Sequence, residues 1–384
     1  MNIINPDSLS NIMEAESITE VFTMHNVLIL TVSVGNGHNQ AAFNMQQNLQ
    51  ASGYTVTTID FLQLQRYGLP NLLSKAYKTL IEYKPSFFRQ ICKISEIETF
   101  DNVKYMLAKT NQRTMGRLVQ KYQPDTILCT HFFPLAAAAA YKKKYHSSFK
   151  LVGIVTDYIV HPIWDVAYVD QYFVAHPALV NQLKSSLHPS GSIIPSGIPV
   201  GPNFTPVAHS ASLNNILIMT SWQTDETMWM ILNVLQALPR TIHFTFVTGN
   251  DLPRQKQLEK IAIHQPNYTV IGFTNQVASL MKKSDLIITK PGGLTITEAL
   301  ATATPILVFS PIPGIEEDNA RFLEQENLGC WAKCENDLRT YINTFMENPE
   351  QLRSLSQNML IQQSSLASSK ILDHLISPIE LVAL

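Results

Sequence analysis

The sequence predicts an α/β protein built from two doubly wound, Rossmann-like domains that face each other across a cleft. Its 384 residues, of which 45% are hydrophobic, are enough for two cores of ordinary size. Short apolar strands end in glycine turns in both halves of the chain, after Val27–Val32 and after Asp285–Thr289. The Gly- and Pro-rich run Gly191–Phe204 predicts an interdomain linker. We therefore divide the chain into an N-terminal extension, a first domain and a second domain, over residues 1–24, 25–203 and 204–384.

Composition and charge restrict the possible partners. Charged residues make up 15% of the chain and the net charge is −2, so nothing global indicates binding to nucleic acid. The four cysteines are scattered in no common metal or redox motif, which is typical of buried thiols in a reducing compartment such as the cytoplasm. We find no run of eighteen apolar residues and no basic-then-apolar leader, so we expect neither a membrane span nor secretion.

The first domain opens with a strand, a glycine loop and a helix. The strand Val27–Val32 leads into Gly35-Asn36-Gly37-His38 and an amphipathic helix through Leu49, and the next strand is Tyr54–Asp60. Open α/β sheets bind ligands at the carboxyl ends of their strands, where this loop lies. Because an imidazole titrates near neutrality, His38 at the loop-to-helix junction is a candidate general base. A helix cap or a solvated side chain is the alternative interpretation.

A basic segment with interleaved aromatic residues follows, from Leu62 to Tyr122. It holds 11 Lys and Arg against four Asp and Glu, a net charge of +7, with apolar pairs such as Leu72-Leu73 and Phe87-Phe88 between the charges. Basic amphipathic helices with exposed aromatic residues suit an anionic membrane surface. The same pattern also fits an ordinary solvated helical face.

A polar loop after a later strand provides further candidates. Strands are predicted at Thr126–Thr130, Leu151–Val155 and Tyr172–Ala175, and the second of these leads into the sequence TDYIVHPIW. Asp157 and His161 in this loop are able to face the cleft.

The second domain carries its most informative stretch at Thr289–Asn319. Its first strand ends at Lys290-Pro291-Gly292-Gly293, and we expect Thr295 or Thr297 to cap the following helix. The free N–H groups and the dipole of such a helix start suit a diphosphate, although an ordinary strand-to-helix turn has the same pattern. After the strand Pro305–Phe309, the chain forms a rigid Pro-Gly turn and an acidic helix start that is placed to bind sugar hydroxyls, with Glu316, Glu317, Asp318 and Asn319.

These stretches together resemble motifs of the UDP-sugar-dependent lipid glycosyltransferases. This family includes monogalactosyldiacylglycerol synthase and processive diacylglycerol glucosyltransferase, and is related to the peptidoglycan UDP-GlcNAc transferase. TKPGGLTITEA and PIPGIEEDN are similar to its TKPGG-T-(S/T)EA and P-PGQE-N motifs. GNGH is similar to its G-x-G-H-x-x-A motif, and TDYIVHPIW to its T-D-(F/Y)-x-x-H-x-x-W segment.

The resemblance implies the GT-B fold and inverting transfer of a sugar from a UDP-sugar to a lipid hydroxyl, with diacylglycerol the first candidate acceptor. The reaction would take place at the cytoplasmic face of the cell membrane, where the basic segment would dock on anionic lipid. His38 would be the catalytic base. A helix N-terminus would stabilise the leaving diphosphate, so neither a metal nor a cofactor is expected.

The resemblance also implies a set of binding residues. On the acceptor side they are Asn39, Asp157, His161 and Trp164. On the donor side they are Gly37, Ser221, Phe273, Lys290, Gly292, Gly293, Leu294, Thr295, Glu298, Gly314, Ile315, Glu316 and Asn319. Of these, Glu298 would hold the ribose, and Glu316 and Asn319 the sugar.

Two departures from the family pattern affect the donor side. After the strand Asn215–Met219 the family has a glycine loop similar to GGSFG, whereas this chain has TSWQTD, in which Asp225 would repel a phosphate. Ile315 stands where the family has Gln, and an isoleucine side chain makes no hydrogen bond to a sugar. Two alternatives therefore stay open: the same chemistry on an undecaprenyl-linked or other hydrophobic acceptor, and a non-catalytic paralogue that binds a nucleotide sugar or a membrane.

The remaining predicted elements complete the second domain. Strands are expected at His243–Thr248 and Tyr268–Ile271, followed by Gly272-Phe273. The tail from Glu350 is expected to be helical and to cross back onto the first domain.

Overall fold

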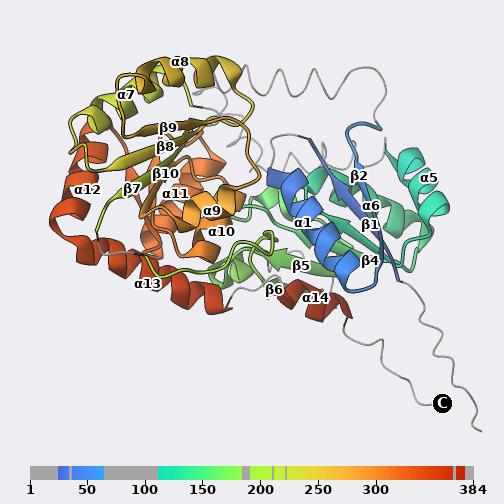
Figure 1. Cartoon of the computed structure of the whole chain (residues 1–384). Helices are drawn as coiled ribbons and strands as arrows, with labels where there is room; N and C mark the ends of the chain where they lie inside the picture. The colour runs from blue at the N-terminus through green and yellow to red at the C-terminus, as the bar shows by residue number, and fades with distance from the viewer. Residues whose placement is uncertain are drawn as a thin grey trace, which may run out of the picture.

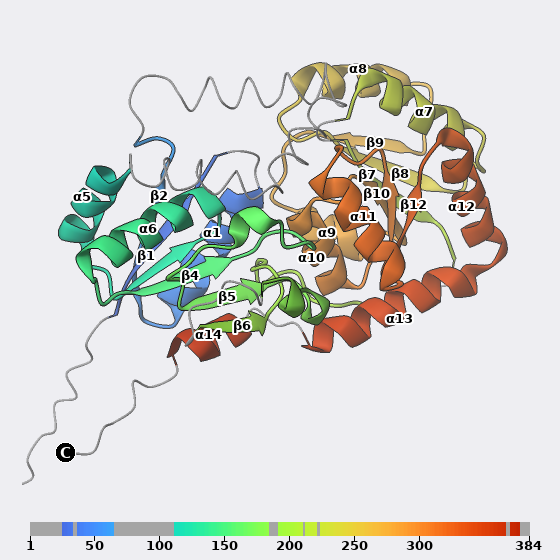
Figure 2. The same cartoon turned by 180° about the vertical axis from the view of Figure 1, so that it is seen from behind.

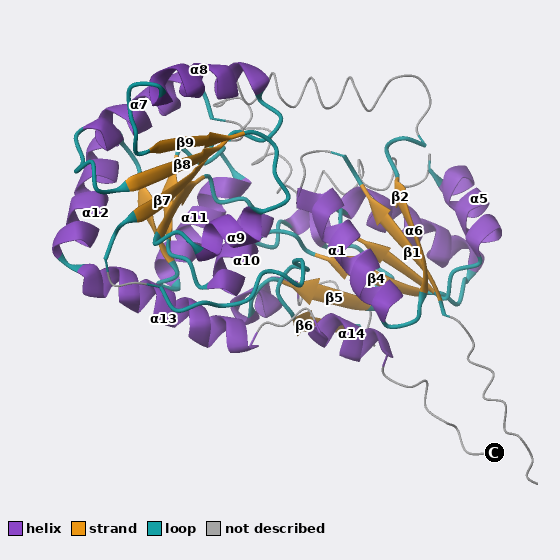
Figure 3. Cartoon of the chain, in the orientation of Figure 1, coloured by secondary structure: helices purple, strands orange, loops and turns teal. Residues whose placement is uncertain are grey.

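In the described part of the chain, two parallel six-stranded sheets, each covered by helices on both faces, lie side by side (Figures 1 and 3). They are seen in a computed structural model that describes residues 25–33, 37–64, 111–183, 191–209, 212–220, 223–365 and 369–376. The expected α/β fold with two doubly wound domains is therefore confirmed. Most of the basic segment, the start of the glycine loop, and Ser221 with Trp222 lie outside the described residues.

The first sheet has the order β2-β1-β3-β4-β5-β6, and all its strands are parallel. Chain order reverses between β1 and β3, which makes this the point where an open α/β sheet binds ligands. The elements of this domain are β1 (Asn26–Thr31), α1 (Gly37–Ala51), β2 (Thr55–Asp60), α5 (Gln112–Tyr122), β3 (Thr126–Cys129), α6 (Phe132–Tyr145), β4 (Lys150–Ile154), η2 (Pro162–Trp164), β5 (Gln171–Val174), η3 (Pro177–Leu183) and β6 (Ser192–Pro195).

Alternating side chains of these strands fill two layers of core. Ile29 of β1 packs in one layer with Met45 of α1, whereas Leu28 of the same strand packs in the other with Leu135 of α6. Burial on both faces explains why the strands read as continuous apolar runs in the sequence rather than as alternating ones.

The second sheet has the order β12-β11-β10-β7-β8-β9, again entirely parallel, with its reversal between β7 and β10. The motif-bearing turn after β10 therefore leaves the sheet at its reversal point, and the turn after β11 leaves it one strand away. Its elements are β7 (Asn215–Met219), α7 (Asp225–Gln236), β8 (His243–Val247), α8 (Leu252–Ala262), β9 (Tyr268–Ile271), α9 (Val277–Lys282), β10 (Leu286–Thr289), α10 (Gly293–Thr302), β11 (Ile306–Phe309), α11 (Ile315–Gln325), β12 (Gly329–Ala332), α12 (Glu335–Glu347), α13 (Pro349–Ser365) and α14 (Ser369–Ile376).

The helix α14 lies against the first domain, below β5 and β6 in Figures 1 and 2. Ile371 is completely buried in the same apolar cluster as Val27 and Phe173. Lys150 Nζ at the start of β4 donates a hydrogen bond of 3.1 Å to His374 O. In the described part of the chain, the run after β6 leads from the first domain to the second, and α13 packs on the second domain whereas α14 packs on the first.

The structure corrects two details of the sequence interpretation. The run assigned to the linker begins with a strand, β6, because Ile193 and Ile194 pair with Tyr172 and Phe173 at the edge of the first sheet. The helix α10 is capped by Gly292 rather than by Thr295 or Thr297. The glycine turn lets the helix start earlier, so that the Thr297 hydroxyl lies inside it and donates to Gly293 O.

Over the residues that the structure describes, no helix combines the length and the apolar character needed to cross a membrane.

Candidate active site

A cavity of about 130 Å³ lies between the domains, at the carboxyl ends of β1, β3 and β4. It brings together four of the predicted residues of the first domain and Ile315 of the second. The residues that line it are His38, His131, Phe132, Asp157, Ile159, His161, Ile163, Trp164 and Ile315.

His38, in the first turn of α1, is oriented by two oxygen atoms of the first domain. Its Nδ1 atom lies 2.9 Å from Thr130 O and 2.8 Å from Thr156 Oγ1. A carbonyl oxygen only accepts hydrogen bonds, so Nδ1 carries the hydrogen and Nε2 keeps its lone pair. Burial lowers the pKa of His38 to about 4, although the bond to Thr130 opposes this shift. The imidazole is therefore neutral at pH 7 and able to accept a proton.

The sequence interpretation missed His131, the residue that follows β3. Its Nδ1 accepts a hydrogen bond of 3.1 Å from Phe133 N and so caps α6. Its ring meets the His38 ring edge-on, with centroids 4.7 Å apart. Burial, together with the neighbouring His38, holds the pKa of His131 well below its ordinary value. The signal for this residue was a histidine at the carboxyl end of the strand beside β1.

Asp157 is the carboxylate of the cavity. Its pKa is raised to about 6, chiefly by burial and also by Glu316, whereas Asn319, Lys290 and His161 act in the opposite direction. At neutral pH the carboxylate is therefore largely ionised, and it protonates in mild acid.

The other acceptor-side residues divide between the cavity and the sheet. His161 and Trp164 line the cavity; His161 Nδ1 accepts a hydrogen bond of 3.2 Å from Ile163 N and caps η2. Asn39 is not among the cavity residues. Its Oδ1 accepts a hydrogen bond of 2.9 Å from Thr31 Oγ1, and its Nδ2 donates one of 2.8 Å to Ser33 Oγ. The structure therefore gives Asn39 a place at the end of β1.

The two halves of the predicted donor stretch are joined by an ion pair between Lys290 and Glu316. Glu316 Oε2 also accepts a hydrogen bond of 2.8 Å from Ile312 N, and Glu317 Oε2 one of 3.2 Å from Gly314 N. Gly314 has a φ of 95°, a conformation that other residues rarely adopt. The turn after β10 and the turn after β11 therefore form one connected surface.

The first domain lies directly over the start of α10. A Cβ atom added to Gly293 would lie 2.0 Å from Thr156 O, so only glycine allows this approach. Leu294 and Thr295 follow in the same turn and are half-buried. The N-terminus of α10, which the sequence predicts as a diphosphate site, thus borders the Asp157 loop.

The remaining donor-side predictions are more widely spread. Glu298 is buried inside α10, and burial raises its pKa to about 8, so it is mostly protonated at neutral pH. Phe273, after β9, is 72% exposed. Gly37 begins α1, and a Cβ added there would meet no atom within 4 Å. Ser221 lies outside the described residues.

Asp225 does not present the isolated charge that the sequence suggested. Its Oδ1 accepts a hydrogen bond of 2.8 Å from Arg254 Nη2, and this arginine of α8 is buried. The same Nη2 donates to Gln223 O at 3.0 Å. Arg254 therefore offsets part of this charge, and the expected repulsion of a phosphate stays a prediction.

Metal ligands do not cluster in this region. Nowhere in the described ranges do three His, Cys, Asp or Glu side chains come together as a metal site. That transfer needs no metal or cofactor stays a prediction.

The amino-acid sequence matches two known families over most of its length. Residues 38–200 match the monogalactosyldiacylglycerol (MGDG) synthase family, and residues 213–371 match the glycosyltransferase family 28 C-terminal domain. The processive diacylglycerol beta-glucosyltransferase of Bacillus subtilis (strain 168) is 25% identical over 377 residues, covering 94% of this chain and 97% of that protein. The enzyme of the same name from Bacillus pumilus (strain SAFR-032) is 24% identical over 377 residues, with the same coverage.

Solved structures share the fold at lower identity. MurG of Acinetobacter baumannii has a TM-score of 0.61 and 14% identity, covering 92% of this chain and all of that one. LpCGTa in complex with UDP has a TM-score of 0.60 and 14% identity, covering 92% of this chain and 99% of that one. These likenesses confirm the GT-B fold. The two matched family domains and their order along the chain show that it belongs to the glycosyltransferases in which an MGDG synthase domain precedes a family 28 C-terminal domain.

Proposed function

We propose that this glycosyltransferase moves a sugar from a UDP-sugar to the hydroxyl of diacylglycerol, with inversion at the anomeric carbon and with His38 as the base. The names of its relatives, which are diacylglycerol glucosyltransferases, support the acceptor, and the similar solved structure that holds UDP supports the donor. The observation that carries the mechanism is the hydrogen bond from His38 Nδ1 to Thr130 O, which leaves Nε2 as the proton acceptor.

The reaction follows from that arrangement. His38 Nε2 takes the proton of the acceptor hydroxyl while the acceptor oxygen attacks the anomeric carbon. The bond between that carbon and the diphosphate breaks, and UDP leaves with the electron pair. Attack opposite the leaving group inverts the configuration. Because the pKa of His38 is low, the base is already deprotonated at pH 7.

The acceptor would reach the cavity from a lipid surface. The segment Leu62–Tyr122 carries a net charge of +7 and interleaved aromatic residues, which suits the anionic cytoplasmic face of a membrane. Ile159, Ile163 and Trp164 give the cavity an apolar wall on the acceptor side. We therefore place the enzyme peripherally on the cytoplasmic face of the cell membrane.

Purified protein incubated with a panel of UDP-sugars and diacylglycerol vesicles tests the proposal. We expect a glycolipid of inverted anomeric configuration, identified by mass spectrometry and proton NMR. His38→Ala should abolish transfer and leave UDP binding by calorimetry largely intact, because the base lies on the first domain. An equal loss of UDP affinity would count against its role as the base.

A chelator provides a second test of the same mechanism. Since the donor stretch offers a helix N-terminus and Lys290 to a diphosphate, transfer should continue in EDTA. Full inhibition that Mg²⁺ restores would contradict the proposed chemistry.

A further inference from the structure

The loop that carries Asp157 is held in place by the second domain. Asn319 of α11 accepts a hydrogen bond of 2.8 Å from Tyr158 N and donates one of 3.2 Å to Asp157 Oδ1. The same amide donates a bond of 3.0 Å to Pro291 O, in the turn after β10. Asn319 has no exposed surface. One buried carboxamide therefore joins the donor turn of the second domain to the acceptor loop of the first.

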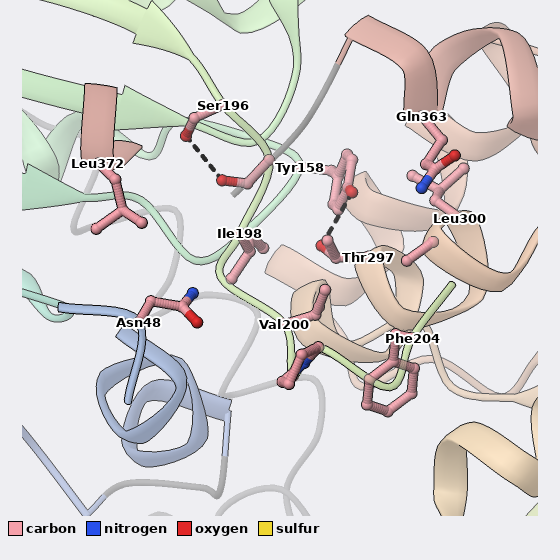
Figure 4. Close-up of a pocket in the computed structure, with 14 residues that line it drawn as sticks. Asn48, Tyr158, Ser196, Ile198, Val200, Phe204, Thr297, Leu300, Gln363 and Leu372 are labelled. Atoms are coloured by element: carbon pink, nitrogen blue, oxygen red, sulfur yellow. Dashed lines mark hydrogen bonds between the residues drawn. The ribbon is translucent and has the colours of Figure 1, made fainter. Parts of the chain in front are cut away.

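Tyr158 makes a second connection that does not involve Asp157. Its hydroxyl lies 3.0 Å from Thr297 Oγ1, in the wall of another interdomain cavity (Figure 4). Thr297 donates its own hydrogen to Gly293 O, so Tyr158 is the donor in this pair. The Tyr158 ring also packs against Phe322 of α11, with centroids 5.1 Å apart. Removing the Tyr158 hydroxyl therefore weakens domain docking while the bond from Asn319 to Asp157 remains.

The two connections have different consequences for the cavity. The bond from Asn319 ends on Asp157 Oδ1, a side-chain atom of a residue that lines the cavity with His38. A carboxylate is useful in a reaction when its rotamer is fixed by a neighbouring group, and here that group comes from the other domain. The bond from Tyr158 ends on α10 and fixes only the path of the loop.

We propose that Asn319 is a positioning residue for transfer, which delivers from the second domain the hydrogen bond that orients the Asp157 carboxylate toward the acceptor hydroxyl. This inference rests on the proposed function and deepens it. It assigns Asn319 to the acceptor side, whereas the family resemblance implies that this residue binds the donor sugar. The acceptor site is then complete only when the two domains are docked.

The electrostatic surroundings of Asp157 provide a readout for this role. Lys290 and Glu316 of the second domain and His161 of its own loop act on it with opposing signs, and the bond from Asn319 favours its ionised form. Removing the Asn319 amide should therefore raise the pKa of Asp157 from its value of about 6. The ionised fraction of Asp157, and with it the rate of transfer, should then fall most in mild acid.

The test compares Asn319→Ala with Tyr158→Phe and with Asn267→Ala. Asn267 is a buried asparagine of the same domain whose Nδ2 donates a bond of 2.8 Å to Ile242 O, so it serves as a matched structural control. kcat/KM for the acceptor is measured against pH at saturating donor. We expect Asn319→Ala to move the acid limb of this pH profile, where kcat/KM falls as the pH drops, to higher pH. The loss of kcat/KM at pH 6 should be about tenfold larger than the loss at pH 8. Neither control should move the limb.

A double-mutant comparison completes the argument. Asp157→Asn should remove the acid limb, and adding Asn319→Ala to it should shift nothing further. If Asn319 instead binds the sugar, Asn319→Ala will raise the donor KM and leave the limb in place, which would overturn the proposal.

A measurement without turnover separates this inference from the proposed function. A ¹³C NMR titration of the carboxyl groups, with the Asp157 signal identified by its absence in Asp157→Asn, should show a higher pKa of Asp157 in Asn319→Ala. An unchanged titration would refute the positioning role. Absence of any sugar transfer by the wild type would refute the proposed function while leaving this result readable.

Discussion

Among the described residues that line the cavity, Ile315 comes from the second domain and the others from the first. It lies in the same cavity as His38, where the donor sugar and the acceptor would meet. An isoleucine at this position contacts an apolar group well, but leaves a sugar hydroxyl without a partner, and an unpaired polar group costs about 1–3 kcal/mol. We therefore expect this side chain to select among donors.

We expect the wild type to prefer a donor with an apolar substituent at this position, such as an N-acetyl methyl group or a deoxy carbon. Ile315→Gln should lower transfer from that donor and raise transfer from UDP-glucose or UDP-galactose, each by about ten- to a hundredfold. The measurement is the same donor panel on both proteins. If neither protein turns over any donor and calorimetry detects no binding of UDP, the proposal of an enzyme should be dropped for the non-catalytic alternative.

Glu298 makes stability depend on pH in a way that can be measured. Its pKa is raised to about 8 by burial, above the ordinary value of 4.5. The folded state therefore favours the neutral acid, and this contribution is present below pH 4.5 and lost as the pH rises through 8. Each unit of this shift corresponds to about 1.4 kcal/mol.

Glu298→Gln should therefore become more stable than the wild type as the pH rises from 5 to 9. The expected result is a widening gap in the free energy of unfolding, read from urea titrations at several pH values. Glu324→Gln, a change in a half-buried residue of α11, serves as the comparison. A constant gap would mean that Glu298 is ionised in the folded protein.

At the scale of elements, the start of α10 is a point of close approach between the domains. A Cβ added to Gly293 would overlap Thr156 O, whereas one added to Gly292 would have its nearest neighbour, Lys290 Nζ, at 3.8 Å. Gly292 also has an ordinary φ of −66°. The adjacent glycines therefore form a matched pair for testing domain docking.

Gly293→Ala should push the Asp157 loop away from α10 and so separate the domains, whereas Gly292→Ala should not. Small-angle scattering and limited proteolysis of the linker will show a more open Gly293→Ala protein. Its kcat/KM should fall by about a hundredfold or more, because displacements of an ångström at a reacting centre cost that much. Equal compactness of the two variants would show that the contact is not needed for docking.

The strands could be predicted from the sequence because each is a local apolar run. β7 and β9 begin and end where the pattern puts them, and β10 and β11 differ only at their first residue. The strand β6 was assigned to the linker because it is only four residues long and lies within a Gly- and Pro-rich run. Patterns within a segment are therefore readable, while pairing at a sheet edge is not.

The candidate site was predictable only in part for a related reason. His38, Asp157 and Ile315 could be found because each belongs to a short motif. His131 was missed because it belongs to none, and the partners of Asn319 and Asp225 were missed because they come from other parts of the chain. Asn319 and Asp157 are 162 residues apart, and only docking of the domains brings them together.

At the scale of the whole molecule, the basic segment Leu62–Tyr122 should make membrane binding depend on charge. We expect the protein to sediment with anionic vesicles and to lose that binding at high salt, because the Debye length falls from about 10 Å at 0.1 M to 3 Å at 1 M. Reversing the charges of Lys75, Lys78 and Lys84 should weaken binding, each cation contributing about 1 kcal/mol. Equal reversal at Lys256, Lys260 and Lys333 of the second domain is the control. Binding that ignores salt and lipid charge would contradict the proposed surface.

The position of α14 has a consequence for how the protein is made. Ile371 belongs to the apolar layer that also contains Ile29 and Phe173, yet the ribosome reaches it only after the entire second domain. At synthesis rates of about 5–20 residues per second, α14 is made on the order of ten seconds after the first domain, and this apolar layer stays uncovered until then. During this interval the nascent chain exposes an apolar surface to which a chaperone can bind, until α14 docks and covers it.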